Sequence, residues 1–338
     1  MLVMNTKIEI SFKTILFAVA SLIAIWVLLQ IREIIFLLFI AFLLMTAIHP
    51  LVLLLERIRI PRVAGILLVY AVVFGFFGAS FVSAVPALVT QSTKLVTELP
   101  SIASRIAPYW NIDVSTITQQ VAPIGESVVK VTLGIFSNIV AIVTVLAFTF
   151  YFLVERQHAD EILKSVIGED AAYQVLTIVR SIEQRLGSWV RGELLLMSFV
   201  GVLSFVGLTV LHVEFALPLA ILAGLLEVIP IVGPTVSAVP AVLVAVSASP
   251  LLALTVAALY IVIQQVENNI LVPIIMKKSV GFAPIMTILS LMIGGKLAGI
   301  MGAVLSVPVA LVIQELLTIV LSRHAESAKK PTKNPSKS

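Results

Sequence analysis

Residues 227–234 read Glu-Val-Ile-Pro-Ile-Val-Gly-Pro and interrupt an apolar run that extends from Phe215 to Ala248. A carboxylate inside such a run costs roughly 2.5 to 3.5 kcal/mol to insert into a membrane, and acids of this kind usually have a function. Each proline removes a backbone donor, so nearby carbonyl groups need other partners or a wet cavity. The stretch predicts a broken membrane helix at a transport pathway. The pathway residues that it nominates are Glu227, Pro230, Gly233 and Pro234.

The composition indicates an all-α polytopic membrane protein. Of the 338 residues, 60% are hydrophobic and only 12% are charged, against about 25% charged in soluble domains. There is no cysteine, which excludes disulfides, thiol nucleophiles, iron–sulfur clusters and cysteine zinc sites. The four histidines show no metal-binding spacing, and no GxxxxGK[ST] loop for ATP is present. We therefore expect no metal, no cofactor and no enzyme activity.

The positive charge is a topology signal. The tail at residues 322–338 carries five basic residues against one acid, which accounts for the whole net charge of +4. We interpret it as a disordered cytoplasmic tail, with binding of lipid headgroups as the alternative, and not as a nucleic-acid site. Loops assigned to the inside hold 17 Lys and Arg residues and those outside hold 5. Both termini are therefore predicted to be cytoplasmic.

The chain divides into six segments. Residues 1–85 hold three transmembrane helices, and residues 86–130 form an external amphipathic helical segment that is either a lid, a subunit contact or a plain connector. Residues 131–154 are the fourth transmembrane helix. Residues 155–191 form a cytoplasmic segment with one apolar helix face. Residues 192–321 are a transmembrane core with broken helices, and the tail follows.

The arms on either side of residues 227–234 are short for membrane spans. Phe215–Pro230 and Gly233–Ala248 have about 16 residues each, whereas a span needs about 20. A re-entrant hairpin gives eight crossings and two full spans give ten, and both counts agree with two cytoplasmic termini. Glu227 is expected to bind a proton or a cation or to accept hydrogen bonds from a polyol. The alternative is a structural acid paired with Arg191 or Lys296.

Two further groups interrupt the apolar core. The first is a polar cluster at the end of an apolar helix, suited to an uncharged polar solute or to hydrogen bonds between helices. The second is a set of candidate helix breaks around Gly294-Gly295-Lys296. The polar cluster comprises Gln264, Gln265, Glu267, Asn268 and Asn269, followed by Pro273, and the candidate breaks are Gly294, Gly295, Gly299 and Pro308.

These motifs carry a family resemblance. Residues 227–234 are followed by the runs Gln265-Val-Glu-Asn-Asn-Ile-Leu-Val-Pro273 and Gly294-Gly-Lys-Leu-Ala-Gly-Ile-Met-Gly302. In this order they resemble the autoinducer-2 exporter family of PerM-like permeases, over roughly residues 10–322. The resemblance implies a helical transporter of a bacterial inner membrane with about eight transmembrane segments, oligomeric in some relatives. Some relatives are linked to export of autoinducer-2, a small oxygen-rich polyol, and others to exchange of sodium or lithium against protons.

We therefore expect a gradient-driven exporter of a small polar solute, with autoinducer-2 as the named candidate. Its site would lie between the turn at Glu227 and the helix end at Gln264–Asn269, because discontinuous helices mark transporter binding sites. The alternatives are a sodium/proton antiporter that uses Glu227, and a membrane scaffold without transport activity. The expected partners are membrane lipid, the solute, H⁺ or Na⁺, and further copies of the same chain in a homo-oligomer.

Overall fold

The computed structural model describes residues 12–73, 139–276 and 284–329, together with the isolated positions 75, 90, 97 and 101. Throughout this described part the chain forms helices and the turns that join them, with no strand. Four of the helices are long and apolar enough to cross a membrane, or five if one bent pair forms a single span. The prediction of an all-α polytopic membrane protein is confirmed. The external segment at 86–130 and most of the tail lie outside the described residues.

The N-terminal part of the described chain forms three helices. Helix α1 (Phe12–Gln30) ends one residue before α2 (Arg32–Arg57), and a shorter apolar helix follows at Arg62–Val73. The break falls at the only charged pair of the first apolar region, Arg32 and Glu33. Buried residues of α2, of the helix at 62–73 and of α5 form one hydrophobic cluster.

Two long helices follow. Helix α5 (Ile139–Ile167) bends by 69° between its apolar part and the polar part that begins at His158. Helix α6 (Glu169–Val210) then runs for 42 residues without a break, about 63 Å at 1.5 Å per residue. The boundary that we predicted at residue 191 is therefore not a helix end. The composition changes there because α6 passes from a charged surface into the apolar core, while the backbone continues unchanged.

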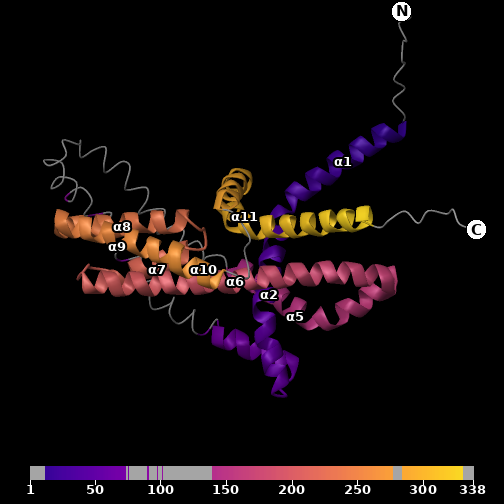
Figure 1. Ribbon diagram of the computed structural model, residues 1–338, viewed down its shortest axis with the longest axis horizontal. Helices are drawn as coiled ribbons and strands as arrows, with labels where there is room; N and C mark the ends of the chain where they lie inside the picture. The colour runs from indigo at the N-terminus through magenta and orange to yellow at the C-terminus, as the bar shows by residue number, and fades with distance from the viewer. Residues whose placement is uncertain are drawn as a thin grey trace, which may run out of the picture.

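Three elements pack along the second half of α6: α7 (Ala216–Leu226), α9 (Pro250–Val266) and a short π-helix η1 (Glu267–Leu271). Helix α8 (Val232–Ala248) packs in turn on α7 and α9 (Figure 1). Helix α10 (Val272–Ile275) continues directly from η1. Buried residues of α6, α7, α8 and α9 form a second hydrophobic cluster. At 11 residues, α7 is about 16 Å long, well short of a hydrocarbon core of about 30 Å.

Helix α11 (Pro284–Lys329) is bent at a place that the sequence indicated only in part. Its non-helical residues are Ala298 and Gly299, and Gly299 has φ +61°, which glycine adopts without strain. Of the candidate breaks, Gly299 has non-helical backbone, whereas Gly294, Gly295 and Pro308 lie within helical backbone.

The close contact of the two arms of α11 explains the role of Gly294. A Cβ atom there would lie 2.3 Å from the Gly302 carbonyl oxygen, so glycine is required for packing and not for a turn. Glycines also allow the neighbours of α6 to approach its backbone closely. A Cβ atom on Gly187 would lie 2.5 Å from the Thr46 carbonyl oxygen of α2, and one on Gly224 of α7 would lie 2.7 Å from the Met197 carbonyl oxygen. Glycine at these positions therefore lets α2 and α7 pack closely against α6.

Candidate functional site

The turn between α7 and α8 is fixed by its backbone. Glu227 ends α7, Ile231 adopts a positive φ of 70°, and the Gly233 N–H donates to the Ile229 carbonyl oxygen at 2.8 Å. A Cβ atom at position 233 would lie 1.9 Å from the Leu226 carbonyl oxygen, so only glycine fits. Pro234 occupies the first turn of α8, where its missing N–H would have no helical partner. Glycine and proline therefore shape a turn that leads directly out of Glu227.

Three buried carboxyl groups from three separate elements lie near this turn, close enough to interact electrostatically. Glu193 comes from the middle of α6, Glu227 from the end of α7, and Glu267 from the start of η1. Their side chains are 4%, 1% and 4% exposed, respectively. Glu227 interacts electrostatically with both of the others. We call Glu193, Glu227 and Glu267 the carboxyl cluster.

Few donors reach the carboxyl cluster. Gln264 Nε2 donates to Glu267 Oε2 at 3.1 Å, and the Glu227 and Glu267 side chains lie within hydrogen-bonding reach of each other. Glu193 Oε1 and Glu227 Oε2 are buried and receive no hydrogen bond from any N–H or hydroxyl group of the described residues. A hydrogen bond between two carboxyl groups requires a proton on one of them, since an ionised carboxylate only accepts.

No cation neutralises the carboxyl cluster within the described part of the chain. The basic residues of α6 have other partners: Arg180 pairs with Asp160, Arg185 pairs with Glu315, and Arg191 donates to the Thr46 carbonyl oxygen and to Ser188 Oγ. The pairing of Glu227 with Arg191 that we considered does not occur. Two like charges 4 Å apart repel by about 4 kcal/mol at an effective dielectric constant of 20, so three ionised carboxylates here would be unstable together.

The predicted polar cluster at the end of α9 is divided between two faces. Gln264 and Glu267 face the carboxyl cluster, whereas Gln265, Asn268 and Asn269 are exposed. Asn269 Nδ2 donates to the backbone carbonyl and the side-chain oxygen of Gln265, at 2.9 and 2.8 Å. The structure thus brings Glu227 to Gln264 and Glu267, and it turns the other three residues away.

The π-helix η1 has a local cause. Pro273, exposed and two residues past η1, lacks the N–H that would bond the Asn269 carbonyl oxygen in an α-helix. The Val272 N–H donates instead to the carbonyl oxygen of Glu267, five residues earlier. Single π turns are often found at functional sites.

Sequence reasoning missed Glu193. Its signal was available, because Glu193 precedes the apolar run Leu194–Val202 just as Glu227 precedes another. Our prediction placed it at the start of the transmembrane core at residues 192–321 and did not single it out. The same holds for Ser204 of α6 and Tyr260 of α9, whose hydroxyl groups are buried.

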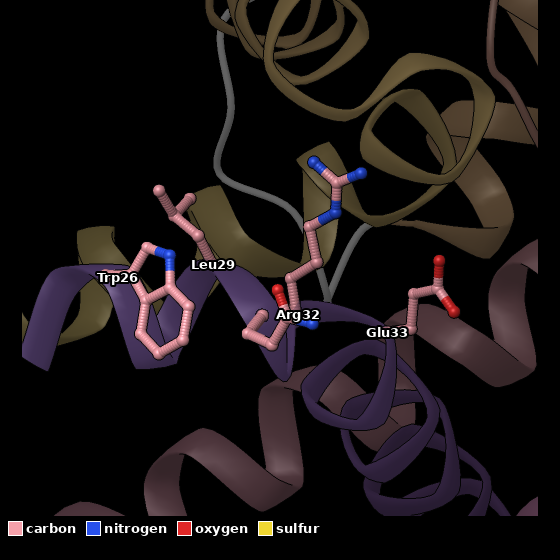
Figure 2. A pocket seen from close by; sticks show the side chains of 5 residues that line it. Trp26, Leu29, Arg32 and Glu33 are labelled. Carbon is pink, nitrogen blue, oxygen red and sulfur yellow. The ribbon is translucent and has the colours of Figure 1, made fainter.

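A separate cavity lies at the break between α1 and α2. It has a volume of about 480 Å³ and is lined by Trp26, Leu29, Gln30, Arg32 and Glu33 (Figure 2). All five lining residues are exposed, so the cavity is an open depression on the surface. It includes no member of the carboxyl cluster and is not the candidate site.

Comparison with known proteins agrees with this architecture. The family described as "AI-2E family transporter" matches residues 15–322. The "Putative transport protein YueF" of Bacillus subtilis is 28% identical over 290 residues, 79% of this chain and 78% of YueF. The "Putative transport protein YrrI" of the same organism is 27% identical over 286 residues, covering 79% and 81% of the two chains. The "Putative permease PerM" of Escherichia coli is 25% identical over 199 residues, covering 57% and 56%. With its apolar helices and a match over nearly its whole length, the chain is a multi-pass membrane protein that belongs to the AI-2E transporter family.

Proposed function

We propose that the protein exports a small polar solute across a bacterial inner membrane, with autoinducer-2 as the first candidate and an ion or solute gradient as the driving force. The observation that supports this proposal is the contact between the α7–α8 turn and the start of η1. Two separate helix interruptions meet there, at Glu227 and Glu267, inside a transporter-family protein. In many membrane transporters, unwound helix segments near the middle of the bilayer bind the solute and the coupling ion.

The chemistry of the site suits an oxygen-rich solute. Glu227 and Glu193 each present an oxygen atom that receives no hydrogen bond from the described residues, and Gln264 contributes an amide group. Hydroxyl groups of a polyol would donate to these oxygens. Alternate exposure of this site to the two sides of the membrane would move the solute.

The experiment measures efflux of autoinducer-2 from proteoliposomes that contain the purified protein. Replacement of Glu227 by Gln and of Gln264 by Ala should each lower the initial rate on the order of tenfold, because each removes an interaction with the solute. Gln265→Ala is the matched control, since this neighbouring glutamine is exposed and faces away from the site. Equal rates for wild type, Glu227→Gln and Gln264→Ala would contradict the site assignment.

A sodium/proton antiporter is the second candidate, and the buried carboxyl cluster is the observation that favours it. Everted membrane vesicles with a pH-sensitive dye separate the two functions. Proton movement that depends on added sodium and disappears in Glu227→Gln would support the antiporter. Proton movement that is unaffected by sodium but depends on the exported solute would support the exporter.

A further inference from the structure

The carboxyl cluster also contains groups that the proposed solute site does not need. Glu193 is fully inside the protein, is more than nine-tenths buried, and has an oxygen atom that receives no hydrogen bond from the described residues. It lies close enough to Glu267 to interact with it electrostatically. A buried acid in this position, without a donor or a cation beside it, indicates a missing positive partner.

Among the described residues, the surroundings of the carboxyl cluster offer no fixed charge that fills this role. Helices α7, α8 and α10 carry no titratable residue, and Tyr260 is the one on α9. The arginines of α6 bind Asp160, Glu315, Thr46 and Ser188. On α5 and α11, Arg156 pairs with Asp160 and Glu183, Glu315 pairs with Arg185, and Lys296 is exposed. Within the described part of the chain, a mobile charge is what remains to balance the carboxyl cluster.

The mobile charge is better explained by protons than by a metal ion. Among the described residues, no group of three or more His, Cys, Asp or Glu side chains has an arrangement that could hold a metal ion. In contrast, Glu227 and Glu267 are both buried side by side, and a single proton shared between two such carboxyl groups would supply the missing hydrogen bond. Gln264 Nε2 donates to Glu267, whereas Glu227 Oε2 receives no hydrogen bond from the described residues.

We propose that Glu193, Glu227 and Glu267 form one proton-binding site, in which Glu227 and Glu267 share a first proton and Glu193 takes up a second. The inference rests on the proposed function in one respect: protons that enter through this site would drive solute export. Each binding step converts one carboxylate and one proton into one carboxylic acid. Loading with two protons reduces the charge of the site from three negative charges to one.

This arrangement links protonation to geometry. Helix α6 carries Glu193, the α7–α8 turn carries Glu227, and η1 carries Glu267. Loss of the shared proton turns the contact between the turn and η1 from a hydrogen bond into a repulsion between two carboxylates. The turn and η1 are the two interruptions that would have to separate for the site to open.

The test is infrared spectroscopy of the purified full-length protein in lipid, with protons as the only ligand added. Wild type should show the C=O stretch of a protonated carboxylic acid at neutral pH. Glu227→Gln and Glu267→Gln should each remove that band, because the glutamine amide can donate the hydrogen bond and no proton is then needed. Glu193→Gln should leave it in place and remove a second band that appears at lower pH. Equal thermal unfolding temperatures establish that the variants are folded.

Glu169→Gln is the matched control, since Glu169 lies on the same helix as Glu193 with an exposed side chain. It should leave both bands unchanged. Absence of a protonated carboxyl band from wild type at neutral pH, or its survival in all three cluster variants, would overturn the inference.

Solute flux separates this inference from the proposed function. Autoinducer-2 efflux from proteoliposomes should rise when a pH gradient is imposed, and this increase should fall on the order of tenfold in Glu227→Gln and Glu267→Gln. If the wild-type protein exports autoinducer-2 without any response to pH and lacks the infrared band, the proton site is overturned. The proposed export function would then stand. The expected band in a protein that moves no autoinducer-2 would support the proton site and contradict that solute.

Discussion

At the scale of single residues, the candidate site depends on one glycine and three acids. Gly233 allows the chain to turn behind Glu227 with the Leu226 carbonyl oxygen in the place of a side chain. The acids could not stay buried together if all were charged, and a proton shared between Glu227 and Glu267 would relieve part of that repulsion. The turn and the carboxyl cluster therefore stabilise each other only in a protonated protein.

Gly233→Ala tests the turn. The added methyl group would overlap backbone atoms of Leu226, which cannot move without distorting α7. We expect the free energy of unfolding to fall by on the order of 2 kcal/mol or more, with solute efflux lost. Thermal unfolding in detergent measures this change. Gly295→Ala is the control, because a Cβ atom there meets nothing within 4 Å; an equal loss of stability in both variants would refute the steric explanation.

At the scale of elements, α6 connects the candidate site with a network of ion pairs near its other end. Arg156 of α5 donates to Glu183 of α6 at 2.8 and 3.2 Å and pairs with Asp160 at 2.9 Å. Arg180 of α6 also pairs with Asp160, while Arg185 and Ser181 bind Glu315 of α11. This network, Arg156–Asp160–Arg180–Glu183 with Arg185–Glu315, ties α5 and α11 to the first half of α6.

The pH dependence of stability should report this network. Partial burial raises the pKa of Asp160, but hydrogen bonds from Arg156 and Arg180 outweigh that effect and leave the pKa below its usual range. Because the folded-state pKa is the lower one, Asp160 stabilises the fold above the unfolded-state pKa, and this contribution is lost as the pH falls through the folded-state pKa. Asp160 is partly exposed, so solvent screening limits the contribution to about 1 kcal/mol or less.

Asp160→Asn is therefore expected to lower the unfolding temperature at neutral pH and to match wild type in strong acid. Thermal unfolding across the pH range checks this. Asp170→Asn, which changes an exposed side chain on α6, should follow the wild-type curve throughout. A constant difference between Asp160→Asn and wild type down to the lowest pH would mean that charge is not the cause.

The sequence predicted the elements better than their ends. Glu227 and Glu267 stood out because each acid interrupts an apolar run, and the structure places them in contact. Glu193 was missed because it stands where the composition changes, at the start of the transmembrane core predicted at residues 192–321. The length of α6 was missed for the same reason, since composition reports the environment of a helix and not its last hydrogen bond. In α11 the sequence offered four candidate breaks and only Gly299 has non-helical backbone, because no pattern of hydrophobicity reveals which glycine adopts a positive φ.

At the scale of the whole molecule, α2 and α6 connect the three hydrophobic clusters. Helix α2 contributes to two of them and α6 to two. Large apolar side chains also cover the outside, among them Phe17 of α1, Leu254 of α9 and Leu297 of α11, each at least 69% exposed. These surfaces fit contact with lipid. The α7–α8 hairpin, packed on α6 and α9, consists of two of the shorter apolar helices, and we propose that it enters the bilayer without crossing it.

Cysteine labelling tests this topology, and the absence of native cysteine removes any background. We expect a cysteine in place of Val232, at the exposed hairpin turn, to resist a membrane-impermeant maleimide from either side, because the α7 arm is only about 16 Å long. Glu169 and Glu214 are both exposed. A cysteine in place of Glu169 should be labelled only in inside-out vesicles, and a cysteine in place of Glu214 only in right-side-out vesicles. Labelling of the Val232 variant from the cytoplasmic side as rapidly as that of the Glu169 variant would show that the hairpin crosses the membrane twice.

The π turn at η1 also sets the angular phase between α9 and α10. Successive residues of an α-helix are rotated by about 100°, so nine steps would put Glu267 and Met276 on opposite sides of an uninterrupted helix. Both nevertheless face α6, where Glu267 meets Glu193 and Met276 packs against Gly192. The extra residue in the π turn removes one step, and the two side chains then differ by about 80°. Converting η1 to an ordinary α-helical turn would therefore rotate either Glu267 or Met276 away from α6.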